Sequence, residues 1–169
     1  MKRILVTDSL ADSGLAILRA RPDIELDYRP GLSGSDLLAA VAQSDGLITR
    51  SGTAVTRELL STGQRLKVVG RAGVGLDNVD VDAATERGIL IINAPTANTI
   101  SATEHTMALL LSLCRNLPAA DASVKRGEWS RARFMGTELN GKLLGIIGLG
   151  RIGTAVATRV RAFGMKTIA

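Results

Sequence analysis

Three glycines in the second half of the chain have the spacing of a phosphate-binding turn. Gly148, Gly150 and Gly153 form the pattern G-x-G-x-x-G, which follows an apolar run and opens a segment with one apolar helical face. In such a turn the first glycine permits a sharp bend, the second lets the backbone approach a pyrophosphate, and the third lets helix and strand pack closely. The helix N-terminus offers free N–H groups and a partial positive charge to the phosphates, and Arg151 can add a charged hydrogen bond. The pattern therefore predicts a dinucleotide site.

Two arginines, Arg50 and Arg71, each follow an apolar run and have glycines close behind them. In a parallel sheet, ligands collect at the carboxyl ends of the strands, where both segments would lie. A guanidinium binds carboxylate or phosphate through two hydrogen bonds, and glycine leaves backbone N–H groups open to an anion. The pattern predicts an anion receptor. The alternative is that both arginines are surface residues beside Asp or Glu partners.

The chain has one histidine and one cysteine, and no Ser-His-Asp set, Cys/His pair or metal-ligand cluster stands out. His105 follows Glu104 on a long helical segment, where a structural role is favoured over a general acid or base. Cys114 ends an apolar run and is expected to be a small buried hydrophobe. We therefore expect no catalytic residue and no metal ligand in these residues.

Short apolar runs alternate with segments of helical periodicity, which is typical of βαβ units and a mostly parallel sheet. The expected strands are 4–6, 24–26, 46–49, 66–70, 89–92, 143–147 and 166–169. The expected helices are 11–19, 35–43, 56–61, 82–87, 101–117, 119–126 and 152–163. The helix 101–117 is apolar on several faces, which indicates a buried or interdomain position.

A domain boundary is expected near Pro95, because the residue before a proline avoids helical geometry and the surrounding residues 93–98 are small and polar. Residues 1–97 then form a nearly complete small α/β domain, and residues 98–169 begin a second one. Gly164 lies where a helix C-cap is expected, before the last strand. The sequence thus predicts an α/β fold in two parts.

Charge and composition limit the classes of partner. Residues 1–98 carry 11 Lys/Arg against 12 Asp/Glu, whereas residues 99–169 carry 10 against 4. A basic half could meet nucleic acid, a membrane surface or a phosphorylated small molecule. Aromatic residues are only 2%, so few side chains could stack on bases, and no apolar stretch is long enough to span a bilayer. We expect a cytoplasmic protein with a small-molecule substrate, no nucleic acid and no membrane partner.

Three long stretches of the chain resemble the D-isomer-specific 2-hydroxyacid dehydrogenase family, and within it the members that oxidise 3-phospho-D-glycerate. They are VVGRAGVGLDNVD (68–80), AATERGILIINAPTANTISATEH (83–105) and FMGTELNGKLLGIIGLGRIGTAVATRVRAFGMKTI (134–168). The resemblance implies a flavodoxin-like substrate domain with a parallel sheet over residues 1–97, followed by the start of a Rossmann NAD-binding domain over residues 98–169. It also implies NAD as the cofactor and a homodimer or higher homo-oligomer.

The resemblance further assigns roles to individual residues. The substrate-anion contacts that it implies are Arg50, Ser51, Arg71 and Gly73. The cofactor contacts that it implies beyond the three glycines are Val74, Arg151 and Ile152. Related enzymes often have threonine at the position of Val74, so only a backbone contact is expected there.

The family's catalytic arginine, glutamate and histidine match no residue up to position 169. We therefore expect the chain to be an incomplete dehydrogenase that shows no turnover alone. Two alternatives stay open: another D-2-hydroxyacid dehydrogenase, acting on glyoxylate, lactate or formate, or a non-catalytic NAD-binding regulatory protein on the same fold. The acidic residue that would distinguish NAD from NADP is expected about 20 residues after the glycine motif and is not among these residues.

Overall fold

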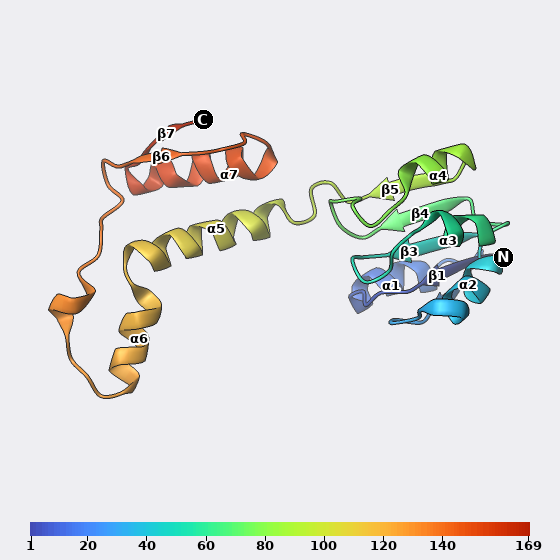
Figure 1. Ribbon diagram of the computed structural model, residues 1–169, viewed down its shortest axis with the longest axis horizontal. Helices are drawn as coiled ribbons and strands as arrows, with labels where there is room; N and C mark the ends of the chain where they lie inside the picture. The colour runs from blue at the N-terminus through green and yellow to red at the C-terminus, as the bar shows by residue number, and fades with distance from the viewer. The chain divides into compact units, whose positions relative to one another are not determined.

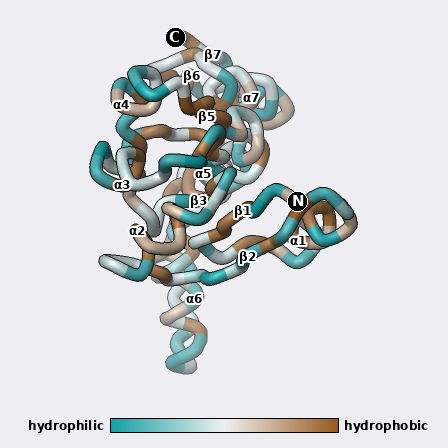
Figure 2. The backbone as a smooth tube through the Cα atoms, turned by 90° about the vertical axis from the view of Figure 1, so that its right-hand side faces the viewer, coloured by the Kyte–Doolittle hydropathy of each residue, from teal (hydrophilic) through white to brown (hydrophobic).

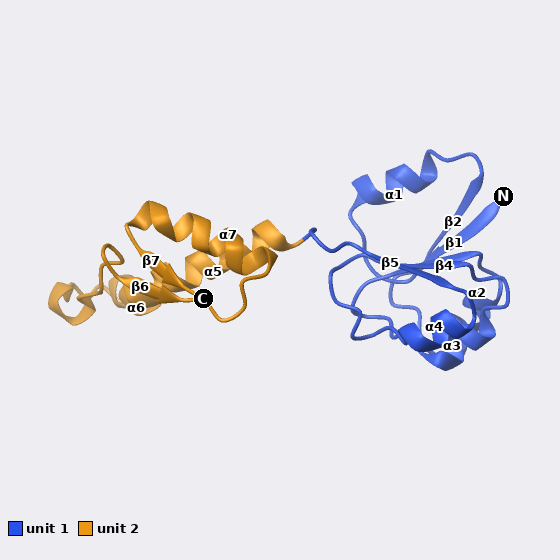
Figure 3. Ribbon diagram, turned by 90° about the horizontal axis from the view of Figure 1, so that it is seen from above, with its two compact units in different colours: residues 1–97 blue, residues 98–169 orange.

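The computed structural model describes residues 1–169, which divide into two compact units, Met1–Ala97 and Asn98–Ala169 (Figure 3). The division falls at the position where the sequence predicted a domain boundary. Each unit has its own hydrophobic core, so each can be described by itself.

Unit 1 is built on a five-stranded parallel sheet with the strand order β2-β1-β3-β4-β5. Its strands are β1 (Lys2–Val6), β2 (Ile24–Tyr28), β3 (Gly46–Thr49), β4 (Val68–Arg71) and β5 (Leu90–Asn93). This order is the flavodoxin-like one, so the predicted fold class is confirmed. Strands β1 and β5 consist largely of hydrophobic residues (Figure 2), as expected for strands of a sheet that helices cover.

Helices cover the sheet of unit 1 on two faces. They are α1 (Asp12–Arg19), α2 (Gly34–Ala42), α3 (Arg57–Thr62) and α4 (Val81–Glu86). The chain moves outward from β1 to β2 and then back across the sheet, and right-handed crossovers therefore place α1 on one face and the other three on the opposite face (Figure 3). The main core lies under α2, α3 and α4, where Leu5, Leu60 and Val69 are fully buried.

Unit 2 holds one βαβ element and the helices that precede it (Figure 1). Its elements are α5 (Thr99–Cys114), α6 (Leu117–Lys125), η1 (Arg131–Phe134), β6 (Leu143–Gly145), α7 (Arg151–Val160), η2 (Arg161–Phe163) and β7 (Lys166–Ile168). Strands β6 and β7 pair in parallel, and α7 connects them. A second core forms where α5 packs against α7 and includes Met107, Val156 and Val160. Gly164 ends the helical segment in the left-handed conformation, as predicted.

Every predicted strand and helix is present, with no end displaced by more than three residues, and only the short η1 was not predicted. The sequence predicted a buried or interdomain position for α5, and within unit 2 this helix is only partly buried. Thr103 and Met107 are buried, but Leu109 and Leu113 are 58% and 78% exposed. The reason is geometric, because within this unit mainly α7 and α6 pack against α5. No helix is both long and apolar enough to cross a membrane.

Asp45 ties the amino ends of two strands together and gives unit 1 a pH dependence. Its carboxylate accepts the backbone N–H of Arg3 at 3.0 Å and the guanidinium of Arg65 at 2.9 Å, with Lys2 at 3.4 Å. The amide of Arg3, followed by the two cationic groups, holds the pKa of Asp45 below its ordinary value of 3.8 despite burial. The ionised carboxylate therefore stabilises the folded state above pH 3.8, and this contribution is lost as pH falls through the lowered pKa.

We expect Asp45→Asn to unfold at a lower urea concentration than the wild type at neutral pH, with the difference shrinking as pH falls below 3.8. Urea titrations followed by circular dichroism between neutral and acid pH would measure this. Asp36→Asn, at an exposed aspartate of α2 without an ion pair, serves as the control and should track the wild type. A difference that stayed constant with pH would contradict the assignment.

Candidate functional site

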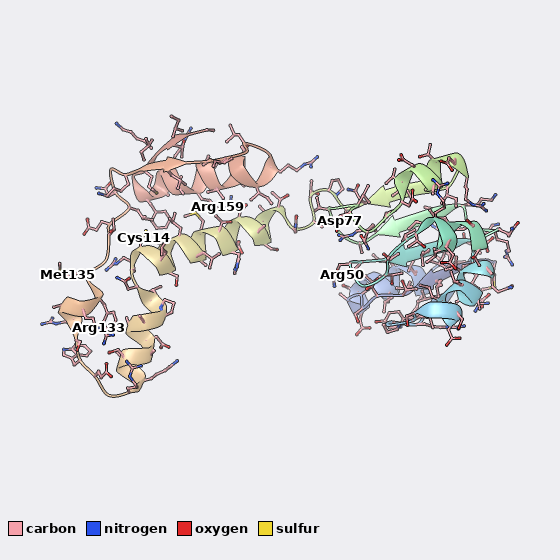
Figure 4. The ribbon with its side chains drawn as sticks, in the orientation of Figure 1. Arg50, Asp77, Cys114, Arg133, Met135 and Arg159 are labelled. Atoms are coloured by element: carbon pink, nitrogen blue, oxygen red, sulfur yellow. The ribbon has the colours of Figure 1, made fainter.

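The carboxyl ends of β3 and β4 bring the two predicted arginine segments together. Thr49 at the end of β3 pairs with Arg71 at the end of β4, and the amide of Ala72 donates to the carbonyl of Thr49 at 2.8 Å. The loops that carry Arg50 and Arg71 therefore start side by side. Figure 4 shows Arg50 at the end of unit 1 toward which these strands point, with Asp77 from the β4 loop at the same end.

The guanidinium of Arg71 lies against Gly73, two residues further along the chain. A Cβ on Gly73 would collide with the Arg71 guanidinium, so this position has to be glycine for the arginine to lie there. No carboxylate is within ion-pair distance of Arg71, and its Nε atom is buried without a hydrogen-bond partner in the protein. Arg71 is therefore not neutralised by a carboxylate, and its Nε has no acceptor within the chain.

Arg50 and Ser51 are exposed on the neighbouring loop. The Arg50 side chain forms no ion pair, and its Nη1 donates only a long bond of 3.4 Å to the carbonyl of Ser9. Neither Arg50 nor Arg71 thus forms an ion pair with an Asp or Glu side chain, although Arg50 is a surface residue and its backbone amide bonds Asp8. Two positive charges without a carboxylate partner favour the binding of an anion at this edge of the sheet.

The backbone amides of these loops do not act as the sequence predicted. The N–H groups of Arg50 and Gly52 donate to the two oxygens of Asp8, at 2.8 and 3.1 Å. The N–H of Gly73 donates to the carbonyl of Arg71 at 2.7 Å. The prediction that these glycine segments leave free amides for an anion is thus wrong for these three groups, because the fold supplies acceptors for them.

Val74, the predicted cofactor contact of unit 1, is half-buried beyond Gly73. Its carbonyl accepts the side-chain amide of Asn93 at 2.7 Å, which fixes the β4 loop to the end of β5. The contact with a cofactor stays a prediction.

The glycine motif of unit 2 has the local geometry of a phosphate-binding turn. Gly148 has φ 95°, in the left-handed region that favours glycine, and a Cβ on Gly153 would collide with the carbonyl of Gly148. A Cβ on Gly150 would meet no protein atom within 4 Å, so the backbone there is open to a ligand. Arg151 and Ile152, both exposed, begin α7, whose first amides have no acceptor within the helix. The residues fit a pyrophosphate.

The titratable groups outside these loops show no comparable arrangement. His105 is exposed on α5, and Cys114 is half-buried at its end. No group of three or more His, Cys, Asp and Glu residues is placed to hold a metal ion.

The family model described as "D-isomer specific 2-hydroxyacid dehydrogenase, catalytic domain" matches residues 4–167. The chain belongs to this family. The matched residues span both units, and they include the two arginine loops of unit 1 and the glycine turn of unit 2.

Individual relatives agree with the family assignment. The chain is 52% identical over 168 residues to D-3-phosphoglycerate dehydrogenase of Methanocaldococcus jannaschii, which is 99% of this chain and 32% of that protein. The chain therefore spans about a third of the length of this curated relative. Among solved structures, it resembles D-lactate dehydrogenase of Aquifex aeolicus in complex with NAD and lactic acid, with TM-score 0.84 and 30% identity over 97% of this chain and 50% of the other.

A second solved structure with a similar fold is a 3-phosphoglycerate dehydrogenase. It is the NAD⁺-bound 3-phosphoglycerate dehydrogenase of Entamoeba histolytica, with TM-score 0.77 and 25% identity over 98% of this chain and 52% of the other.

The sequence analysis did not predict two side chains that support the arginine loops. Asp8 holds the loop after β3 by its amides, and Asn78 holds the same loop by the carbonyls of Arg50 and Thr53, at 2.8 and 2.7 Å. A signal for Asp8 existed, since it lies two residues after β1 at the carboxyl edge of the sheet, where ligand sites gather. For Asn78 the sequence contains no comparable signal.

Proposed function

We propose that the chain is part of an NAD-dependent oxidoreductase that oxidises 3-phospho-D-glycerate to 3-phosphohydroxypyruvate, a reaction that belongs to serine biosynthesis. The observation that carries the proposal is the 52% identity with a D-3-phosphoglycerate dehydrogenase over nearly the whole chain. In this proposal unit 1, residues 1–97, is the substrate-binding domain, and unit 2, residues 98–169, is the beginning of the NAD-binding domain.

The charges of unit 1 suit a substrate with two acidic groups. 3-Phospho-D-glycerate carries a carboxylate and a phosphate, and Arg50 and Arg71 offer two guanidinium groups without carboxylate partners. Guanidinium binds either anion through two hydrogen bonds, and the Ser51 hydroxyl can add a third donor. Gly73 contributes by leaving space for the Arg71 side chain.

The turn of unit 2 suits the pyrophosphate of NAD. When NAD is bound, its nicotinamide ring would accept the hydride. Gly148, Gly150 and Gly153 let the backbone come close, and the amides at Arg151 and Ile152 would donate to the phosphate oxygens. We propose Val74 of unit 1 as a further backbone contact with the cofactor.

The alternatives, another D-2-hydroxyacid dehydrogenase or a non-catalytic NAD-binding regulatory protein, are less well supported. Lactate and glyoxylate carry one acidic group, which leaves one of the two arginines without an anion. The relative with 52% identity is named as a dehydrogenase and not as a regulatory protein. We also propose that the protein is cytoplasmic. We further propose that it forms homodimers or larger homo-oligomers, because α5 and α6 expose the apolar side chains of Leu109, Leu113 and Leu117.

An NMR titration of the ¹⁵N-labelled chain tests the binding part of the proposal. 3-Phospho-D-glycerate should shift the signals of residues 50–52 and 71–74, and NAD should shift those of residues 148–153. D-lactate and glyoxylate should shift the first set more weakly at equal concentration. Stronger shifts with lactate than with phosphoglycerate would contradict the proposed substrate, and NAD shifts spread evenly over unit 2 would contradict the proposed cofactor site.

We expect the 169 residues to bind these ligands without turning them over. None of the family's catalytic arginine, glutamate and histidine matches a residue of this chain, and within unit 1 the Asp8 carboxylate accepts two amides, so it is not a free base beside the arginines. The absorbance of NADH, followed after phosphoglycerate and NAD are mixed with the chain, should stay at the level of a sample without protein. Sustained NADH formation would show that the catalytic groups lie within these residues.

A further inference from the structure

The loop that carries Arg50 and Ser51 is held by hydrogen bonds to three side chains, those of Asp8, Asn78 and Thr7. Asp8 accepts the amides of Arg50 and Gly52, one on each carboxylate oxygen. The side-chain amide of Asn78 donates to the carbonyls of Arg50 and Thr53. The hydroxyl of Thr53 at its end bonds that of Thr7, and both threonines are buried.

Of these contacts, those made by Asp8 are the only charged ones. A Cβ on Gly52 would collide with an oxygen of Asp8, so the loop passes directly over the carboxylate. Asp8 is half-buried and forms no ion pair with any Lys or Arg, including Arg50. Its negative charge is therefore satisfied by backbone amides alone, which are strong partners for a carboxylate.

This arrangement has two consequences for an incoming anion. The amides of Arg50 and Gly52 cannot donate to the anion, because Asp8 occupies them. The guanidinium groups and the Ser51 hydroxyl remain as donors for the anion, and the two hydrogen bonds to Asp8 set the backbone from which the Arg50 side chain extends. A carboxylate that accepted a salt bridge from Arg50 would compete with the ligand, and Asp8 avoids this by bonding the main chain instead.

We propose that Asp8 is a positioning residue for substrate binding, which acts through Arg50 by fixing the loop at residues 50–52. This inference rests on the proposed function for the identity of the anion, 3-phospho-D-glycerate. It assigns Asp8 no direct contact with the substrate and no part in the chemistry.

A double-mutant cycle between Asp8 and Arg50 tests the proposal, with dissociation constants for 3-phospho-D-glycerate measured by calorimetry on the full chain. Asp8→Asn keeps one acceptor oxygen but presents an NH₂ group to the second amide, and it should weaken binding about tenfold. Because Asp8 acts through Arg50, the double variant with Arg50→Ala should bind no more weakly than Arg50→Ala alone. Asp12→Asn, at an exposed aspartate of α1, is the matched control and should bind like the wild type.

The cycle separates positioning from a purely structural role. If Asp8 served stability alone, Asp8→Asn would lower the melting temperature and leave the dissociation constant of the folded chain unchanged, which would overturn the proposal. Additive effects of the two substitutions would overturn it as well. A wild-type chain that does not bind phosphoglycerate would overturn the proposed function, and that failure is distinguishable because it appears before any substitution is made.

Discussion

Replacing Arg71 by alanine should remove most of the affinity of unit 1 for 3-phospho-D-glycerate. The guanidinium has no carboxylate partner, and its Nε has no acceptor in the protein, so the donors are not committed to other residues. A charge-assisted pair of hydrogen bonds contributes about 2–3 kcal/mol, which corresponds to about 30- to 150-fold in the dissociation constant. Calorimetric titration of the chain with phosphoglycerate measures the loss.

Two further variants make the Arg71 experiment specific. Arg71→Lys keeps the charge but loses the planar pair of donors, so it should bind more weakly than the wild type and more tightly than Arg71→Ala. Arg87→Ala removes a positive charge from the end of α4, where no ion pair is present, and should change the affinity little. If Arg87→Ala weakened binding as much as Arg71→Ala, the effect would reflect net charge, and the proposed site would be wrong.

Replacing Gly153 by alanine should disrupt the turn of unit 2 and with it the binding of NAD. The added Cβ would overlap the carbonyl of Gly148, a main-chain atom that cannot move without bending the turn, and would also crowd Ile146 at 3.2 Å. Overpacking of this kind costs about 1–3 kcal/mol of stability. Because the displaced turn presents its amides in the wrong place, the affinity for NAD should fall by about tenfold or more.

The same substitution at another glycine provides the control. Gly14 in α1 has no neighbouring heavy atom within 4 Å of an added Cβ. Gly14→Ala should therefore raise stability slightly, by about 0.5–1 kcal/mol, since alanine favours the helix. Thermal unfolding and an NAD titration of both variants would test the pair. Wild-type affinity for NAD in a folded Gly153→Ala chain would exclude the turn from the cofactor site.

The order of elements followed from local pattern. Alternating short apolar runs and segments of 3.6-residue periodicity predicted every strand and α-helix of both units, because side chains must match the period of the element that buries them. The glycine turn could be predicted equally well, since the strand before it, the helix after it and the spacing of Gly148, Gly150 and Gly153 all lie within one short segment. The extent to which α5 is buried could not be predicted, because a helix with several apolar faces does not reveal how many neighbouring helices its unit supplies.

The sequence by itself thus determined the α/β architecture, the strand–turn–helix around Gly148 and the presence of two glycine-flanked arginines. Only the tertiary structure decided which groups around those arginines are free. The bonds from Arg50 and Gly52 to Asp8 join residues 42 and 44 positions apart, and the bond from Asn78 to Arg50 spans 28. Such partners meet only when β1, β3 and β4 align their carboxyl ends, so the sheet, and not any local motif, assigns the amides to Asp8 and leaves the guanidinium groups without carboxylate partners.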